Sequence, residues 1–195
     1  MGKQALKTQR TRGRIIDATV ALICEGGFAA ASSSRIAERA GMTWGAAQHH
    51  FGSKEDILEA ILALSYEKFL ATMGIPQLRK GSLTARADHF VDRMWTHYQT
   101  DLCFAALEIL LGTREDHGHA ARIWDQKQGR AHLKILREVF PEVKLSNSQL
   151  QEALVFAHCC LTGLRIKYLC DGRLPHLDRH LRRIKRATLL MLNGR

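Results

Sequence analysis

Residues 32–57 read SSSRIAERAGMTWGAAQHHFGSKEDI, a stretch with two short helical segments on either side of Gly41. Thr43 is placed to cap the second segment, which carries a tryptophan, a glutamine and two histidines on barely two turns. A helix of that length is not stable alone in water, because nucleation opposes it. We therefore expect a core to hold it on one side, while its polar side chains face outward.

The composition of the whole chain narrows the class of protein. Its 195 residues suffice for a hydrophobic core, with 46% apolar and 25% charged residues. Only three prolines occur and β-branched residues are sparse, which favours helices. The formal net charge of +10 indicates a polyanionic partner, with nucleic acid as the first candidate and a membrane surface as the second.

Helical periodicity runs through the chain. Residues 8–25 form one expected helix, which the sequence EGGF ends. Two helices follow within Ser33–Phe51, and Ser53 with Asp56 forms a capping box for the next one. The prediction is an all-α fold of about nine helices, with a three-helix N-terminal domain over residues 1–60 and a larger helical domain over 61–195. Beyond GIPQLRKGS, helices are expected at about 82–99, 101–113, 116–139, 147–171 and 175–193.

The segment Ser33–Phe51 has the pattern of a helix-turn-helix. Small or aliphatic residues such as Ile36, Ala40 and Ala47 allow two short helices to pack closely at a steep angle. In that geometry the second helix can lie in the major groove of DNA, while the first spans the backbone. The polar side chains of the second helix would then face bases and phosphates.

The chain resembles the TetR family of bacterial repressors from about Arg10 to Ile61. The resemblance rests on RIIDATVALICEGGF, SSSRIAERAGMTWGAAQHHF and SKEDILEAI, which follow the family's order. It implies a cytoplasmic bacterial regulator that binds a palindromic operator in double-stranded DNA as a homodimer. Gln48 stands where the family usually has a tyrosine, and His50 where an aromatic residue is common. Gln48 can bond a phosphate, or it can bond N6 and N7 of adenine together.

The residues expected to contact DNA come from three parts of this domain. A basic N-terminal arm suits phosphates or the minor groove, the starts of the second and fourth helices suit phosphates, and the recognition helix suits bases. For His49 and His50 the alternative is packing against Phe51 and the first helix. The predicted set, with its recognition motif at about 33–52, is Arg10, Arg12, Ser33, Ser34, Arg35, Thr43, Trp44, Gly45, Ala46, Gln48, His49, His50 and Lys54.

The last two helices carry apolar seams. A single helix-turn-helix reads one half-site, so a dimer is expected, and the seams either pair with a second copy or pack within the chain. The first of the two helices has a further apolar face with Phe156, Cys159, Gly163 and Ile166, which favours burial on two sides. The predicted interface residues are Leu150, Leu154, Ala157, Leu161, Leu164, Tyr168, Leu177, Leu181, Ile184, Thr188 and Met191.

The resemblance also implies a pocket for a small-molecule inducer among the middle helices. An inducer would favour a conformer in which the two recognition helices no longer match half-sites about 34–36 Å apart. Apolar and aromatic side chains would line the pocket, although each of them taken singly is more typical of ordinary core. The predicted lining is Met94, Trp95, Tyr98, Phe104, Leu107, Leu111, Trp124 and Phe156, with His158 or Arg165 as polar anchor.

Other classes of function are less well supported by the sequence. It contains no phosphate-binding loop, no nucleophile-elbow motif and no Glu-x-x-His pair, so neither an enzyme nor a cofactor is expected. An alternative is a metal- or redox-sensing repressor of the same fold, using Asp116, His117 and His119 or the adjacent Cys159–Cys160. A membrane partner is not expected, because no segment reaches the apolar length of a membrane span. The sequence RHLRRIKR, from Arg179 to Arg186, suggests a basic membrane-surface helix as a further alternative, but its charges surround a seam that is already assigned to dimerisation.

Overall fold

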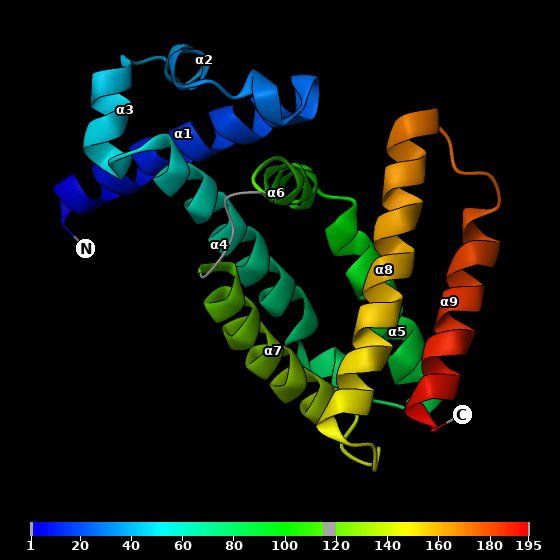
Figure 1. Cartoon of the computed structure of the whole chain (residues 1–195). Helices are drawn as coiled ribbons and strands as arrows, with labels where there is room; N and C mark the ends of the chain where they lie inside the picture. The colour runs from blue at the N-terminus through cyan, green and yellow to red at the C-terminus, as the bar shows by residue number, and fades with distance from the viewer. Residues whose placement is uncertain (1, 115–119, 195) are drawn as a thin grey trace. The chain divides into compact units, whose positions relative to one another are not determined.

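The computed structural model describes residues 2–114 and 120–194, and the side chains of residues 2–114 and 128–194. Over this part of the chain the structure is helical and has no strand, so the predicted all-α class is confirmed. The helices, labelled in Figure 1, are α1 (Lys3–Gly26), α2 (Ser33–Arg39), α3 (Trp44–Phe51), α4 (Lys54–Met73), α5 (Leu83–Tyr98), α6 (Asp101–Gly112), α7 (Ala120–Val139), α8 (Asn147–Asp171) and α9 (Leu177–Leu192), with 3₁₀ turns η1 (Phe28–Ala30) and η2 (Pro76–Arg79).

Side-chain caps explain where these helices begin. At α4, the Asp56 carboxylate accepts a hydrogen bond from the Ser53 backbone N–H at 2.8 Å, while the Ser53 hydroxyl oxygen accepts one from the Asp56 N–H at 3.1 Å. This reciprocal pair is the predicted capping box. Five other described helices begin after a hydroxyl residue that accepts from the N–H three residues on: Ser32, Thr43, Ser82, Thr100 and Ser146.

The first helix is longer than its apolar periodicity indicates. It begins at Lys3 instead of near residue 8, and its first buried side chain is Ile15. The early turns therefore lie outside the core. They contain no glycine or proline before Gly13, so no residue interrupts the helix there. The basic N-terminal segment is a helix in this structure and not a flexible arm.

The chain divides into two compact units, and the first comprises the residues up to Glu67 together with α6. In this unit α6 packs against α1 and η1. The contacts thus add α6 to the helices that the sequence grouped within residues 1–60. The core of the unit includes Ile15, Leu22, Ile23, Ile36, Ala47, Phe51, Ile57, Ile61, Ala105 and Ile109.

Phe28 is the centre of the contact between η1 and α6. Its backbone N–H donates to the Glu108 carboxylate at 3.2 Å, and its ring lies against Gly112 at the end of α6. The Lys54 ammonium group lies 5.1 Å from the centre of the same ring. The absence of a side chain at Gly112 is what allows this close approach.

The second unit contains residues 68–99 and the chain that follows α6. Within it α8 packs against α5, α7 and α9, and Figure 1 shows α8 and α9 running side by side. Lys185 of α9 donates to Asp92 of α5 at 2.7 Å, and Arg86 pairs with Glu142. The core includes Phe90, Val91, Met94, Leu136, Phe140, Leu150, Leu154, Ala157, Leu161 and Ile184.

By length and composition, α8 is the one described helix that could cross a membrane, with a mean hydropathy of 1.3 over its most apolar window. The sequence had indicated no such segment. One face of α8, including Leu150 and Leu161, is buried in the second unit, and its other face is also rich in apolar residues. The high hydropathy therefore reflects a helix with two apolar faces.

Replacing Gly112 with alanine tests the contact between α6 and η1. The added Cβ would lie 2.3 Å from the Phe28 ring, so the ring or α6 must move, and the free energy of unfolding should fall by about 1–3 kcal/mol. Denaturant unfolding measures this change. The control is Gly13→Ala in α1, where no atom lies within 4 Å of the added Cβ and stability should rise by up to about 1 kcal/mol. Equal effects at the two glycines would contradict the described packing.

Candidate nucleic-acid interface

The turn between α2 and α3 depends on Gly41. Its φ is +66°, a left-handed conformation that strains residues with a side chain. The Gly41 N–H donates to the Glu38 carbonyl, and the Met42 N–H donates to the Ala37 carbonyl, both at 3.0 Å. These two bonds close the end of α2, and Thr43 then caps α3 through the Ala46 N–H at 3.3 Å. The predicted helix-turn-helix therefore forms.

The recognition helix α3 has a buried face and an exposed face. Ala47 and Phe51 are buried in the core of the first unit. Trp44 and His50 are half-buried, and the two histidine rings make an edge contact with centres 5.7 Å apart. The remaining side chains and the glycine are open to solvent: Gly45, Ala46, Gln48 and His49.

Two arginines of α1 hold the C-terminal ends of the motif's helices. Arg12 donates to the backbone carbonyl of His50, and its guanidinium carbon lies 3.8 Å from the centre of the Phe51 ring. Arg14 donates to the carbonyl of Ala40 at the end of α2. Carbonyls at helix C-termini lack partners within the helix and favour a cation. Through these contacts α1 fixes the position of both helices.

Arg12 was predicted to contact DNA, and the structure gives it this intrachain contact instead. Arg14 was missed as a positioning residue. The sequence contained a signal for Arg12, because it lies three residues before the buried Ile15 and so shares a helix face with it.

The other predicted DNA-contacting residues differ in exposure. Lys54 is half-buried over the Phe28 ring, which restricts its reach. Arg39 of α2 was not in the predicted set. It pairs with Glu25, and this hydrogen bond holds the pKa of the Glu25 carboxyl below its usual value. Ser33 is also half-buried, and the fully exposed members beyond α3 itself are Arg10, Ser34, Arg35 and Thr43.

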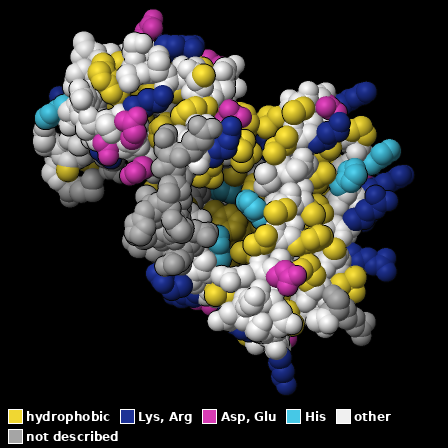
Figure 2. All heavy atoms as spheres, viewed as in Figure 1, with side chains coloured by type: hydrophobic (Ala, Val, Ile, Leu, Met, Phe, Trp, Pro, Cys, Tyr) yellow, Lys and Arg dark blue, Asp and Glu magenta, His cyan; other side chains and the backbone are white. Residues whose placement is uncertain are grey.

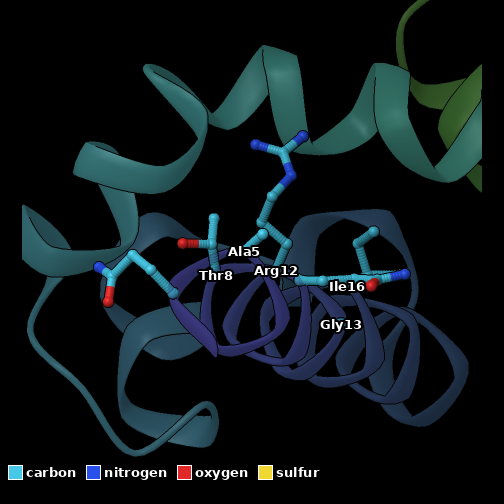
Figure 3. A pocket seen from close by; sticks show the side chains of 7 residues that line it. Ala5, Thr8, Arg12, Gly13 and Ile16 are labelled. Atoms are coloured by element: carbon cyan, nitrogen blue, oxygen red, sulfur yellow. The ribbon is translucent and has the colours of Figure 1, made fainter. Parts of the chain in front are cut away.

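A groove of about 660 Å³ runs along one side of α1, next to Arg12 (Figure 3). All of its lining residues belong to α1, at the spacing of one helix face. A single helix cannot enclose a small molecule, so the groove is an open surface and not a ligand cavity. Figure 3 shows the Arg12 side chain projecting from α1 toward a neighbouring helical segment of the same chain. The lining residues are Gln4, Ala5, Thr8, Gln9, Arg12, Gly13 and Ile16.

The residues predicted to line an inducer pocket are divided between the two units. Phe104, Leu107 and Leu111 belong to α6 in the first unit, and Leu111 is exposed. The Trp124 side chain lies outside the described residues. In the second unit Met94, Trp95 and Tyr98 are buried, Phe156 and Arg165 are half-buried, and His158 is exposed.

A polar cluster that the sequence only partly indicated lies in the second unit. The Tyr98 hydroxyl is hydrogen-bonded to Nδ1 of His158, and both residues belong to the predicted pocket lining. His97 is buried, and its ring contacts Phe69 with centres 5.4 Å apart, while the half-buried His132 contacts Phe69 from 5.2 Å. Desolvation lowers the pKa of the buried His97 below its usual value, because packing around the ring disfavours the charged form. It also lowers the pKa of His158, because the ring packs against Tyr98 although the residue as a whole is exposed.

The structure corrects part of the predicted dimer interface. Leu150, Leu154, Ala157, Leu161, Ile184 and Thr188 are buried inside the second unit of a single chain. They are core residues, closed to a second copy. Leu164, Leu177, Leu181 and Met191 are half-buried, and Tyr168 is exposed.

The other face of α8 is the accessible one. Val155 is 56% exposed and Ile166 is 41% exposed, and Cys159 and Gly163 lie open between them. These positions follow one another at four- and three-residue steps and so form a single stripe. Figure 2 shows hydrophobic side chains at the surface along α8. An exposed apolar stripe of this kind is typical of an interaction surface.

The candidate metal and redox groups receive no structural support. Asp116, His117 and His119 lie outside the described part of the chain. Among the residues that are described, no group of three histidine, cysteine or acidic side chains could hold a metal ion. Cys159 and Cys160 are free thiols, and desolvation raises the pKa of the Cys160 thiol.

The geometry of α2, Gly41 and α3 defines a helix-turn-helix protein. A sequence model described as "Bacterial regulatory proteins, tetR family" matches residues 15–61. Over these residues the N-terminal domain of the chain thus matches the TetR family model.

Individual relatives are similar to parts of the chain. The HTH-type transcriptional regulator SrpR of Pseudomonas putida is 41% identical over 61 residues, which are 31% of this chain and 29% of that protein. UidR of Escherichia coli K12, also an HTH-type transcriptional regulator, is 33% identical over 94 residues, 48% of this chain and 44% of that protein. The chain thus matches less than half the length of either relative.

The likeness of fold extends over nearly the whole chain. A crystal structure of a transcriptional regulator from Rhodococcus sp. Rha1 has a TM-score of 0.75 and covers 94% of this chain and 96% of that one. The sequence identity is 18%, so the similarity is one of fold.

Arg12→Ala should destabilise the first unit and loosen α3. It removes a charged donor from the His50 carbonyl and a cation from the Phe51 ring, so the free energy of unfolding should fall by about 1–2 kcal/mol. Thermal or denaturant unfolding provides the measurement. The matched control is Arg10→Ala, which removes an exposed cation from the same helix and should leave stability within about 0.5 kcal/mol. If both variants unfolded alike, Arg12 would not be a positioning residue.

Stability should fall as the pH drops below about 6.5. His97 and His158 have lowered pKa values in the folded state, so the unfolded chain binds protons first and mild acid favours unfolding. Melting temperatures between pH 7.5 and 5.5 measure the slope. His97→Gln and His158→Gln should each flatten it, whereas His89→Gln, at an exposed position of α5, serves as control. A slope unchanged in both test variants would contradict the assignment.

Proposed function

We propose that the protein is a transcriptional regulator that binds double-stranded DNA through α3. The two-sided character of α3 is the main support: Ala47 and Phe51 anchor it in a core, whereas Gln48 and His49 stand exposed. A helix that is fixed on one side and polar on the other suits insertion into the major groove. The net charge of +10 favours association with the phosphate backbone.

The exposed residues divide by chemistry into base readers and phosphate binders. Gln48 is the first candidate for reading a base, because its amide can bond N6 and N7 of adenine together. The small Gly45 and Ala46 allow the backbone of α3 to approach the groove closely. Ser34 and Arg35 at the start of α2 suit phosphates, where helix N-termini attract anions.

The N-terminal turns of α1 supply further phosphate contacts in this proposal. Lys3, Lys7 and Arg10 are exposed and recur at four- and three-residue steps, so they share one side of the helix. As part of α1 they form a rigid row of cations, which fits the backbone better than the interior of the minor groove.

A homodimer would place two such helices on a palindromic operator, with half-sites about 34–36 Å apart. The exposed stripe of Val155, Cys159, Gly163 and Ile166 on α8 supports a second copy as partner. Small residues at Cys159 and Gly163 would let two helices approach closely. Pairing of identical faces around a two-fold axis needs a self-complementary surface, and an apolar stripe satisfies that condition.

The regulator would act in the bacterial cytoplasm as a repressor that a small-molecule inducer releases from DNA. The hydrogen-bonded pair of Tyr98 and His158 in the second unit is the part of the predicted pocket that supports a ligand with a polar group. An inducer must bind the released conformer more tightly than the DNA-bound one, because equal affinity shifts no equilibrium.

Two measurements test the proposal together. Selection of bound duplexes from a random pool should enrich a sequence with two-fold symmetry, and sedimentation equilibrium should give the mass of two chains. A monomer at micromolar concentration, or a protein that enriches no sequence at moderate salt, would refute the proposal.

Gln48→Ala should change base preference. If the contact to adenine is bidentate, the variant loses about 1–3 kcal/mol at one position of the operator and discriminates less there. Arg35→Ala should weaken all sequences alike and reduce the salt slope by about 1. Fluorescence anisotropy on the selected operator and its single-base variants, at several salt concentrations, separates the two effects. Uniform weakening by both variants would show that Gln48 does not read a base.

A further inference from the structure

A second concentration of positive charge lies on α9, away from the helix-turn-helix in sequence. Arg179, Arg183 and Arg186 are exposed and follow one another at four- and three-residue steps, so they form one row, the α9 arginine stripe. Figure 2 shows Lys, Arg and His side chains gathered on the side of the second unit where Figure 1 places α9.

The acids near this stripe form their salt bridges with other cations, and Asp178 also interacts electrostatically with Arg179. Asp178, the only acid of α9, pairs with Arg182 at 2.8 Å, and Asp171 pairs with Lys167 at 2.5 Å. Like charges three and four residues apart on a helix repel one another. An anionic partner that contacts all three arginines would remove this repulsion.

The opposite face of α9 is already occupied. Ile184, Thr188 and Leu192 are buried in the second unit, and Lys185 pairs with Asp92 of α5. An amphipathic helix that binds a membrane surface must insert its apolar face among the lipids. Most of that face of α9 is part of a core, and Leu190, 42% exposed, lies four residues beyond Arg186. One exposed leucine gives the helix little apolar surface to insert among lipids, which favours a nucleic acid over a lipid surface.

The residue type and spacing also fit a phosphate backbone. The exposed stripe contains arginines and no lysine, and the planar guanidinium group can make two parallel hydrogen bonds to a phosphate. With a rise of about 1.5 Å per residue, the stripe is about 10 Å long. Duplex DNA carries about six phosphates over that length of axis.

We propose that the α9 arginine stripe is a second, sequence-independent contact for duplex DNA. It is separate from the operator contact of α3 and belongs to the other compact unit of the chain. A protein with both contacts would hold a specific site through α3 and a further stretch of DNA backbone through α9.

The test uses the full-length protein and the triple variant Arg179→Glu, Arg183→Glu, Arg186→Glu. Binding of a random-sequence duplex should weaken at least about tenfold, and its salt slope should become shallower by about 2 to 3, because three phosphate contacts are lost. The matched control is Lys80→Glu, Arg130→Glu, Lys144→Glu, which makes the same change of charge at exposed positions of the same unit. The control should retain more of the affinity and its salt slope.

Three further readouts decide between explanations. The α9 variant should keep the preference of the unaltered protein for operator DNA over random DNA. If the unaltered protein shows no such preference, that result counts against the proposed function but not against the α9 arginine stripe. Equal losses in the α9 and control variants would show a general effect of charge and overturn the stripe. A changed dissociation constant of the dimer in the α9 variant would also overturn the proposal. The same holds if the α9 variant loses binding to phosphatidylglycerol vesicles but retains binding to random DNA.

Discussion

The burial of Ala47 and Phe51 against α1 is the constraint on which the helix-turn-helix depends. A helix as short as α3 has no stability of its own, so only this packing orders the residues on its outer face. Arg12 and Arg14 fix the orientation of α3 and α2, because each donates a hydrogen bond from α1 to a carbonyl at the C-terminal end of one of these helices. The exposed side chains of α3 are therefore positioned by residues that pack against its buried face and that need not contact DNA themselves.

The same logic extends to α6. Phe28 lies in η1, two residues beyond the end of α1, and Glu108 and Gly112 hold α6 against it. In sequence α6 lies between α5 and α7, which belong to the second unit, yet it packs against α1 and η1 of the first unit. Contacts within the first unit thus connect α6 to the helix that positions α3.

Local signals in the sequence predicted the helix-turn-helix and most helix bounds, but not the start of α1 at Lys3. Hydroxyl caps such as Thr43 and Ser53, and the left-handed Gly41, act through bonds within a few residues, so their effect can be predicted without the fold. The assignment of faces failed where two faces of one helix are apolar. On α8 periodicity identified both faces but could not tell that Leu150 and Leu161 point into the chain, whereas Val155 and Ile166 point out. That choice depends on the neighbours α5, α7 and α9, which lie far away in sequence.

Charged residues were hard to assign for a related reason. Arg12, Arg10 and Arg179 look alike in a basic sequence, yet the first is held by a carbonyl and an aromatic ring, while the other two are exposed. A guanidinium group bonded within the fold keeps its charge, but it cannot bond a phosphate directly without giving up those contacts. The net charge of +10 consequently overstates the charge available for binding at any one surface and conceals its distribution. Exposed rows of cations occur on both α1 and α9, so the basicity of this chain is not explained by the recognition domain alone.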